Sequence, residues 1–141
     1  MKISVVERRW AHLIFDTIFP RNAHPNLQLG AEDCDIEGYL DEVSRVWPAF
    51  SLLALRATLL FVILATPFVL RRPRSFAAAS PADRERVLDV LYSSPIYYIR
   101  GLVVLMKALA GILYGSDPAV RATLLRGHAR SLTVLTAGGA R

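Results

Sequence analysis

The stretch FSLLALRATLLFVILATPFVLRR, Phe50 to Arg72, decides the fold, because it is the most apolar part of the chain and holds one arginine, Arg56, in its interior. Between Pro48 and Pro67 there is room for about 18 helical residues, or about 27 Å at 1.5 Å per residue. This length is close to the hydrocarbon thickness of a bilayer. The segment therefore predicts either a membrane-spanning helix or a helix at the core or an interface of a bundle.

Charge and length favour a buried or interface helix. Arg56 would lie near the middle of a span, where insertion of an arginine costs about 2.5 to 3.5 kcal/mol. The uncharged run from Ala57 to Leu70 is about 14 residues long, which is more typical of a core helix. Pro67 is predicted to end the helix early. A transmembrane span over residues 50–70 stays as the alternative.

Composition limits the classes of protein. A chain of 141 residues is expected to form one domain with a core of its own. Its formal charge is +5, from 17 Lys and Arg against 12 Asp and Glu. Cys34 is the only cysteine, so an intrachain disulfide is excluded. The N-terminal MKISVVERRW lacks the apolar core of a secretory signal. We therefore expect a cytoplasmic location, with contact at the inner face of the membrane left open.

The segments on either side of Phe50–Arg72 also have helical periodicity. From Ser4 to Phe19, apolar side chains recur at helical spacing, with Glu7 placed on the polar side; they are Val6, Trp10, Leu13, Ile14, Thr17 and Ile18. A short helix with one apolar side is predicted before Pro48. Ser80 is expected to cap a helix that has Pro81 at its first position.

The segment from Ile96 to Tyr114 predicts a helix that is apolar over most of its circumference, with one polar line through Arg100, Lys107 and Tyr114. Strand patterns are absent. The predicted fold is all-α, a small irregular bundle of about five or six helices. We expect residues 1–125 to form the helical domain and residues 126–141 to form a tail that is mobile or bound to a partner.

No arrangement of residues predicts chemistry in this chain. His12, His24 and His128 lie in different segments, and neither a nucleophile with a partnered base nor a glycine-rich phosphate loop is found. We therefore predict no catalytic, cofactor-binding or metal-binding residue. The basic run at residues 71–74 lacks interleaved aromatic residues. Positive charge alone suggests a DNA-binding helical regulator, so that interpretation is the weakest and we expect no nucleic acid partner.

Three segments resemble a known family. They are a first helix ending in IFP at Ile18 to Pro20, the segment Phe76 to Leu88 (FAAASPADRERVL), and the segment Ser94 to Pro118 with its IRGL and LYGSDP. Together they resemble the small helical subunit of flavin-dependent oxidoreductases of the glucose-methanol-choline type, such as gluconate 2-dehydrogenase subunit 3. They also resemble the N-terminal helical region of long-chain alcohol oxidases.

The resemblance implies a non-catalytic accessory subunit. Its partner would be a separately encoded large subunit that holds the FAD and acts on an alcohol, a sugar or a steroid. The small chain would cover an apolar flank or the substrate entrance of that subunit and stabilise it, since burying apolar area can supply a permanent interface. The candidate partner-binding residues are Trp10, Phe19, Arg56, Arg71, Arg72, Tyr97, Tyr98 and Arg100.

Overall fold

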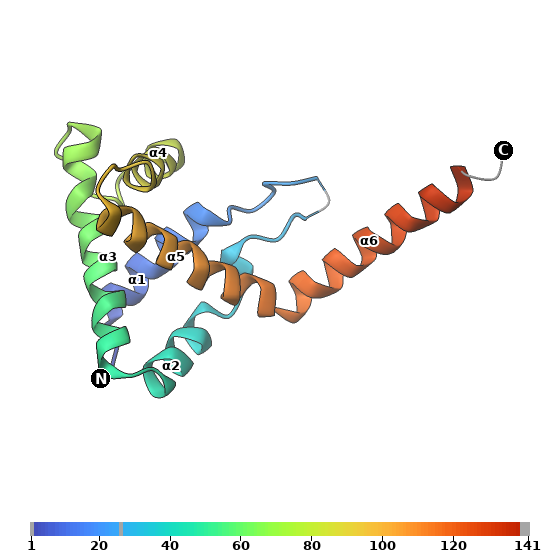
Figure 1. The fold of residues 1–141 in the computed structure, drawn as a ribbon, viewed down its shortest axis with the longest axis horizontal. Helices are drawn as coiled ribbons and strands as arrows, with labels where there is room; N and C mark the ends of the chain where they lie inside the picture. Colours follow the sequence, from blue (N-terminus) through green and yellow to red (C-terminus); the bar gives the residue numbers. More distant parts are fainter. Residues whose placement is uncertain (1, 26, 139–141) are drawn as a thin grey trace.

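Six α-helices make up the fold in the computed structural model, which describes residues 2–25 and 27–138 (Figure 1). They are α1 (Val5–Ile18), α2 (Ile36–Val46), α3 (Ala49–Leu70), α4 (Pro81–Tyr92), α5 (Tyr97–Ser116) and α6 (Pro118–Gly138), with a short 3-10 helix η1 (Ala31–Asp33) before α2. These residues contain no strand, only an isolated bridge between His24 and Leu27. The predicted all-α class is confirmed.

Helices α1, α3, α4 and α5 supply most of the core, to which α2 adds Ile36, Leu40 and Val43 and α6 adds Val120. Helix α1 packs against α3, α4 and α5, and α3 also packs against α4 and α5. Helix α2 packs against α1 and leads through Trp47 and Pro48 into α3. Helix α6 leaves the end of α5 and extends away from the body (Figure 1). The largest fully buried side chains come mainly from the four central helices and from the loop before α4; they include Phe15, Ile14, Leu59, Phe76 and Met106.

The buried face of α1 is rotated from the predicted stripe, of which only Ile14 is fully buried. A capping box starts the helix, because Ser4 N–H donates to Glu7 Oε2 at 2.7 Å and Glu7 N–H donates to Ser4 Oγ at 3.3 Å. The cap and an arginine from α3 satisfy the Glu7 carboxylate, so this residue lies in the buried face with Ala11, Ile14 and Phe15. Val6, which was predicted to be in the stripe, is exposed instead.

Helix α3 extends beyond Pro67, where the sequence predicted that it would end. The chain stays helical through Pro67 to Leu70, and Thr66 Oγ1 donates to the Val62 carbonyl oxygen at 2.8 Å in the turn before the proline. The helix ends at Arg71, which has φ 53° and so lies in the left-handed region. Pro67 is only four positions from this end, so the helix loses one backbone donor and is not stopped. The predicted early end at Pro67 is wrong.

One face of α3 belongs to the core and the other does not. Its buried side chains are Leu52, Leu55, Thr58, Leu59, Val62 and Thr66, which recur at helical spacing. The hydroxyl of Thr58 donates to the Ala54 carbonyl oxygen at 2.7 Å, which satisfies it within the helix. The inner face of α3 is therefore an ordinary bundle face, although the helix is apolar on all sides.

Helix α5 is central, and its predicted polar line holds only in part. Arg100 is exposed and Lys107 is half-buried, but Tyr114 is buried. The Tyr114 ring stacks on Phe19 with a centroid distance of 4.5 Å, and its hydroxyl donates to the Leu29 carbonyl oxygen at 2.6 Å. A tyrosine can occupy a core position when its hydroxyl finds an acceptor. Placing Tyr114 on a polar line was therefore wrong.

The loop between α1 and α2 is anchored at Phe19, the residue whose ring stacks on Tyr114. The Ala31 N–H donates to the Phe19 carbonyl oxygen at 2.8 Å. At Gly30 a Cβ atom would come within 2.6 Å of the Arg21 backbone nitrogen, so only glycine allows this close approach. The loop between α1 and α2 is therefore packed against the end of α1 and against α5.

Helix α6 crosses the boundary that we expected at residue 125. It starts at Pro118 behind Asp117, whose carboxylate accepts from the Ala119 N–H at 2.9 Å, and Val120 is buried in its first turn. The helix then continues to Gly138. Gly127 does not stop it, because one glycine within a helix costs only about 1 kcal/mol. Whether residues 126–141 bind a partner stays a prediction.

Two adjacent leucines on α3 test the assignment of its two faces. Leu59 is fully buried, whereas Leu60 is 46% exposed. We expect Leu59→Ala to lower the free energy of unfolding by about 2 to 5 kcal/mol, because it leaves a cavity in the core. Leu60→Ala, the matched control, should cost less than about 1 kcal/mol in the monomer. Urea unfolding at low protein concentration measures both, and equal losses would contradict this arrangement.

Candidate partner-binding surface

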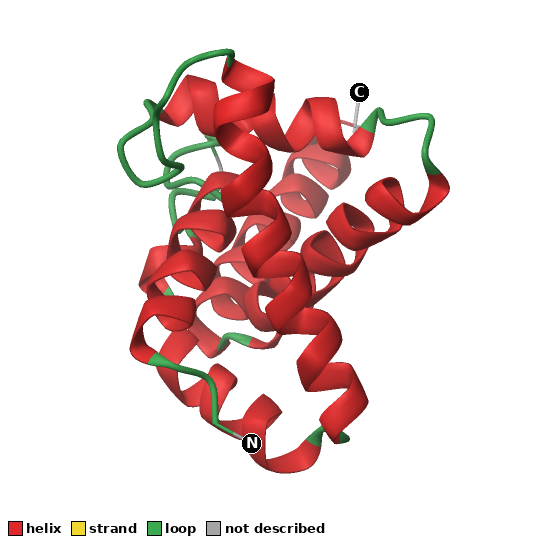
Figure 2. Cartoon of the chain, turned by 90° about the vertical axis from the view of Figure 1, so that its left-hand side faces the viewer, coloured by secondary structure: helices red, strands yellow, loops and turns green. Residues whose placement is uncertain are grey.

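The outer face of α3 is a continuous apolar stripe. It consists of Phe50, Leu53, Leu60, Leu64 and Phe68, with the exposed Ala57 between them, and we call these six residues the α3 stripe. The two phenylalanines at its ends are 80% and 82% exposed, and the leucines are about half exposed. In Figure 2, α3 runs down the side that faces the viewer, and no other helix covers it.

None of the partner-binding residues predicted from the sequence belongs to the α3 stripe. Its spacing was visible in the sequence, because positions 50, 53, 57, 60 and 64 alternate steps of three and four. The signal was masked by the apolar residues on every other side of α3. Only packing shows which apolar residues the core uses and which it leaves exposed.

Shallow apolar grooves lie on both sides of the α3 stripe. The groove toward α1 has a volume of about 500 Å³, and its apolar lining includes Val6, Trp10, Leu53, Ala57 and Leu60. The groove toward α5 has a volume of about 320 Å³; it is lined by Trp47, Pro48, Phe50, Ser51, Ala54 and Leu105. The stripe and its grooves form one surface that can receive large apolar side chains.

Arg56 has an internal partner. Its Nε donates to Glu7 Oε1 at 2.5 Å, and the side chains of Arg56 and Glu7 are 34% and 11% exposed. Burial raises the pKa of the Glu7 carboxyl, but hydrogen bonds from Ser4 and the Arg56 charge outweigh it, so the pKa lies below its ordinary value. Arg56 thus joins α3 to α1, and contact with a partner would use only its exposed part.

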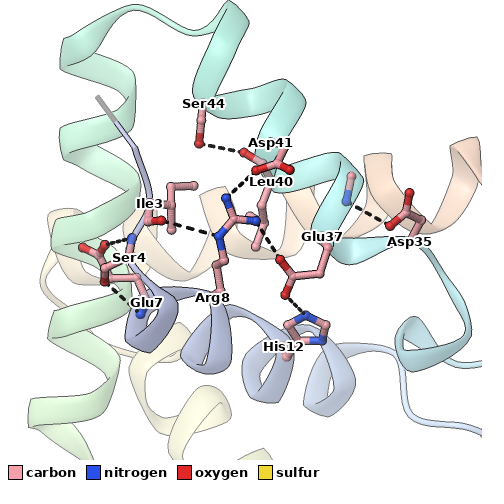
Figure 3. A network of polar contacts seen from close by, with 11 residues as sticks. Ile3, Ser4, Glu7, Arg8, His12, Asp35, Glu37, Leu40, Asp41 and Ser44 are labelled. Atoms are coloured by element: carbon pink, nitrogen blue, oxygen red, sulfur yellow. Dashed lines mark hydrogen bonds and ion pairs between the residues drawn. The ribbon is translucent and has the colours of Figure 1, made fainter.

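A polar network joins α1 to α2 (Figure 3). Arg8 donates to Glu37 at 2.6 Å and also pairs with Asp41, while His12 Nε2 lies 2.9 Å from the second Glu37 oxygen. The Arg8 hydrogen bond, followed by the His12 contact, holds the pKa of the Glu37 carboxyl below its ordinary value. Arg8 is 19% exposed and its neighbours in the network are 41% to 68% exposed, so the network is explained by the docking of α2 onto α1 near the surface.

An aromatic corner lies at the start of α5. Tyr97 and Tyr98 are 72% and 81% exposed, and their rings meet edge to face with centroids 5.9 Å apart. The Arg100 guanidinium lies 5.8 Å from the Tyr97 ring centroid. We call these three residues the α5 corner. Tyrosine and arginine are enriched among the residues that dominate binding at protein interfaces.

The remaining candidates fall into two groups. Arg71 and Arg72 are exposed at the end of α3, where neither forms an ion pair within the described part of the chain. Trp10 and Phe19 are half-buried and pack against the core. Their truncation would disturb the fold, so the structure gives both residues an internal role. Whether either also contacts a partner stays a prediction.

Neither a metal-binding cluster nor an ionised thiol is found among the described residues. They contain no group of three or more His, Cys, Asp or Glu side chains placed to hold a metal ion. Cys34 is buried, and burial raises the pKa of its thiol to about 11, so the thiol stays protonated at neutral pH. The arrangement of side chains is suited to binding through apolar and aromatic contacts.

The chain was compared with known proteins at the level of sequence and of structure. No family model, no curated protein and no solved structure matches it. The function of the chain is therefore inferred from its own residues and from the resemblance of the three segments.

The pairing of Glu7 predicts a pH effect. Because the pKa of Glu7 is lowered in the folded state, its carboxylate stabilises the fold above the unfolded pKa of about 4.5. This contribution is lost as the pH falls through the folded pKa. We expect Glu7→Gln to cost about 1 to 3 kcal/mol at pH 7 and clearly less at the acid end of the transition. Urea unfolding of both proteins across this pH range measures the difference, and a constant difference would contradict the role of the ionised carboxylate.

Proposed function

We propose that this protein is a non-catalytic small subunit that binds and stabilises a separately encoded FAD-dependent dehydrogenase of the glucose-methanol-choline type. It covers an apolar flank or the substrate entrance of that enzyme, whose substrate is an alcohol, a sugar or a steroid. The FAD belongs to the large subunit, and the small chain binds none. The observation that carries the proposal of a docking role is the exposed α5 corner.

The α5 corner is suited to contact with a protein. Two adjacent tyrosines present large rigid rings, and Arg100 adds a charge held near one of them. Ile96, just before the helix, is 53% exposed and extends the apolar area. Leaving these side chains in water has no evident benefit to the fold of the single chain. Burial against a partner would remove their apolar area from water and stabilise both proteins.

The segments that carry the family resemblance lie together in the fold. The first ends α1, the second leads into α4 and the third spans α5, and these three helices pack against one another. Phe76 of the second segment is fully buried, and Arg84 donates to its carbonyl oxygen at 2.9 Å. The likeness therefore concerns a connected structural unit, which supports the proposal of an accessory subunit.

A membrane-anchored protein is the second candidate function. By length and composition alone, α3 and α5 could each cross a membrane, and about a third of each such window is buried in the bundle. The α3 stripe supports contact with lipid. Against a span, crossing would take Leu59 and Val62 away from the core and place the Arg56–Glu7 pair within the bilayer.

Extraction from the native host separates the two candidates. A tagged chain is expressed there, its membranes are washed with high salt and with detergent separately, and the chain is recovered from each fraction. We expect a soluble complex with a larger protein that has a flavin absorbance spectrum. A colourless chain released only by detergent would overturn the accessory-subunit proposal and favour the span.

The α5 corner can be tested on the purified complex. We expect Tyr98→Ala and Arg100→Ala each to weaken binding to the flavoprotein by about 10- to 100-fold. Phe50→Ala, which truncates an equally exposed aromatic residue on α3, is the matched control and should leave that affinity unchanged. Turnover of the flavoprotein saturated with the variant chain should match that with wild type. A variant that binds normally but slows the chemical step would contradict a non-catalytic role.

A further inference from the structure

We propose that the α3 stripe docks on the surface of an anionic membrane, with α3 lying in the plane of the bilayer and the bundle still folded. The phenylalanines and leucines of the stripe enter the outer part of the acyl region, and the arginines that follow α3 contact the headgroups. This inference goes beyond the proposed function and differs from the membrane span, which would take α3 out of the bundle. It also uses a surface separate from the α5 corner, so the two proposals can fail independently.

The composition of the α3 stripe is suited to acyl chains. Its six residues carry no polar side-chain atom over a length of about 27 Å, and Phe50 and Phe68 are the most exposed of them. Interfaces between proteins contain about one hydrogen bond per 100 to 200 Å². A stripe whose side chains offer none is better suited to lipid. Helices that lie in the membrane interface have a face of Leu, Phe and Trp side chains that is buried about 5 to 10 Å deep.

Both tryptophans of the chain lie beside the stripe. Trp10 lines the groove toward α1 together with Leu53 and Leu60. Trp47 lines the groove toward α5 together with Phe50. Tryptophan is enriched at membrane–water interfaces, where its ring lies at the level of the headgroups. When the stripe enters the outer acyl region, the two indole rings come close to that level on either side of α3.

Positive charges without an internal ion pair border the stripe. Arg71, Arg72 and Arg74 follow the last turn of α3; all three are exposed, and none forms an ion pair in the ranges that the structure describes. The same is true of Arg9, which lies three positions after Val6 of the groove and so on the same side of α1. These four guanidinium groups are complementary to anionic headgroups.

The acidic residues of α2 and of the start of α1 are neutralised within the chain. Glu7 pairs with Arg56, and the three carboxylates of α2 pair with arginines of α1 and α2. Glu85 and Asp89 of α4 line a pocket to which α3 contributes no residue. The charge that borders the stripe is therefore mainly positive. Two copies of this surface would repel each other, whereas an anionic membrane attracts it, by about 1 kcal/mol for each basic residue near the surface.

The orientation in the membrane plane leaves the fold intact. Leu59 and Val62 stay in the core while the stripe meets lipid, because opposite sides of α3 face the two environments. No other helix covers the outer side (Figure 2). The pair between Arg56 and Glu7 stays beside the stripe, where water and headgroups solvate its exposed part. Docking therefore requires no unfolding of the bundle.

Flotation of the purified full chain with vesicles, without detergent, tests the docking. We expect the wild type to float with vesicles of phosphatidylglycerol and phosphatidylcholine, and at least tenfold more weakly with phosphatidylcholine alone. Leu60→Glu and Leu64→Glu should each weaken binding at least tenfold, because they place a charge among acyl chains. Ile112→Glu, at a similarly exposed position on α5, changes the net charge equally and should bind like the wild type. Circular dichroism verifies that each variant is folded.

Removal of charge beside α3 tests the electrostatic part. The double variant Arg72→Gln, Arg74→Gln should weaken vesicle binding about 30-fold at low salt, since each arginine near an anionic surface contributes about fivefold. Arg71 is kept because it ends α3 in the left-handed conformation. The matched control Arg121→Gln, Arg126→Gln removes the same net charge from exposed positions on α6 and should have a much smaller effect. Added salt should reduce the difference between the two double variants.

The depth of three labelled positions separates docking in the plane from a span. In a Cys34→Ser background, a fluorophore is attached to Phe50→Cys, Leu60→Cys or Phe68→Cys. Lipids brominated near the headgroup should quench all three labels more strongly than lipids brominated near the bilayer centre. A label at position 60 that is quenched most strongly from the centre would show a span and overturn the proposal.

The remaining outcomes also decide the proposal. A wild-type chain that does not float with the anionic vesicles overturns it, and so does flotation that Leu60→Glu leaves unchanged. Equal binding to phosphatidylcholine alone would contradict the role of the arginines. A dimer in sedimentation equilibrium that Leu60→Glu dissociates would assign the stripe to a second copy instead. Leu60→Glu should still bind the flavoprotein, which keeps this test separate from that of the proposed function.

Discussion

The ion pair between Arg56 and Glu7 is the interaction on which the placement of α3 depends. A helix that is apolar on every side can rotate with little loss unless a polar group fixes it. Arg56 supplies that group, since its Nε lies 2.5 Å from a Glu7 oxygen that the α1 cap already holds in place. The pair is only partly exposed, so breaking it would leave a charge with few partners. It therefore fixes which side of α3 meets α1.

Once α3 is oriented, its two faces have different roles. The inner face supplies the core with residues such as Leu59 and Val62, and the outer face presents the α3 stripe to solvent. The same division occurs on α5, where Met106 is buried while the tyrosines of the α5 corner are exposed. Two separate exposed surfaces result, the α3 stripe and the α5 corner.

Local signals predicted the elements well, because they act within a few residues. The Ser80 cap formed as expected, with Asp83 N–H donating to its hydroxyl at 3.2 Å, and Pro81 occupies the first turn. The errors arose where a distant contact outweighed a local preference. Glu7 is buried because it pairs with Arg56, which lies 49 positions away in the sequence. Tyr114 is buried because its hydroxyl donates to the Leu29 carbonyl oxygen. No periodicity in one segment contains that information.

The sequence by itself determined the all-α class, the caps, most helix boundaries and the lack of a recognisable catalytic motif. These properties follow from hydrophobic period, proline position and side-chain chemistry, all of which are local. The tertiary structure alone decided which apolar residues of α3 and α5 are covered. Residues such as Leu59 and Leu60 are adjacent and chemically identical, yet one is buried and the other is 46% exposed. Only the packing of other helices distinguishes them, because burial depends on neighbours that are remote in the chain.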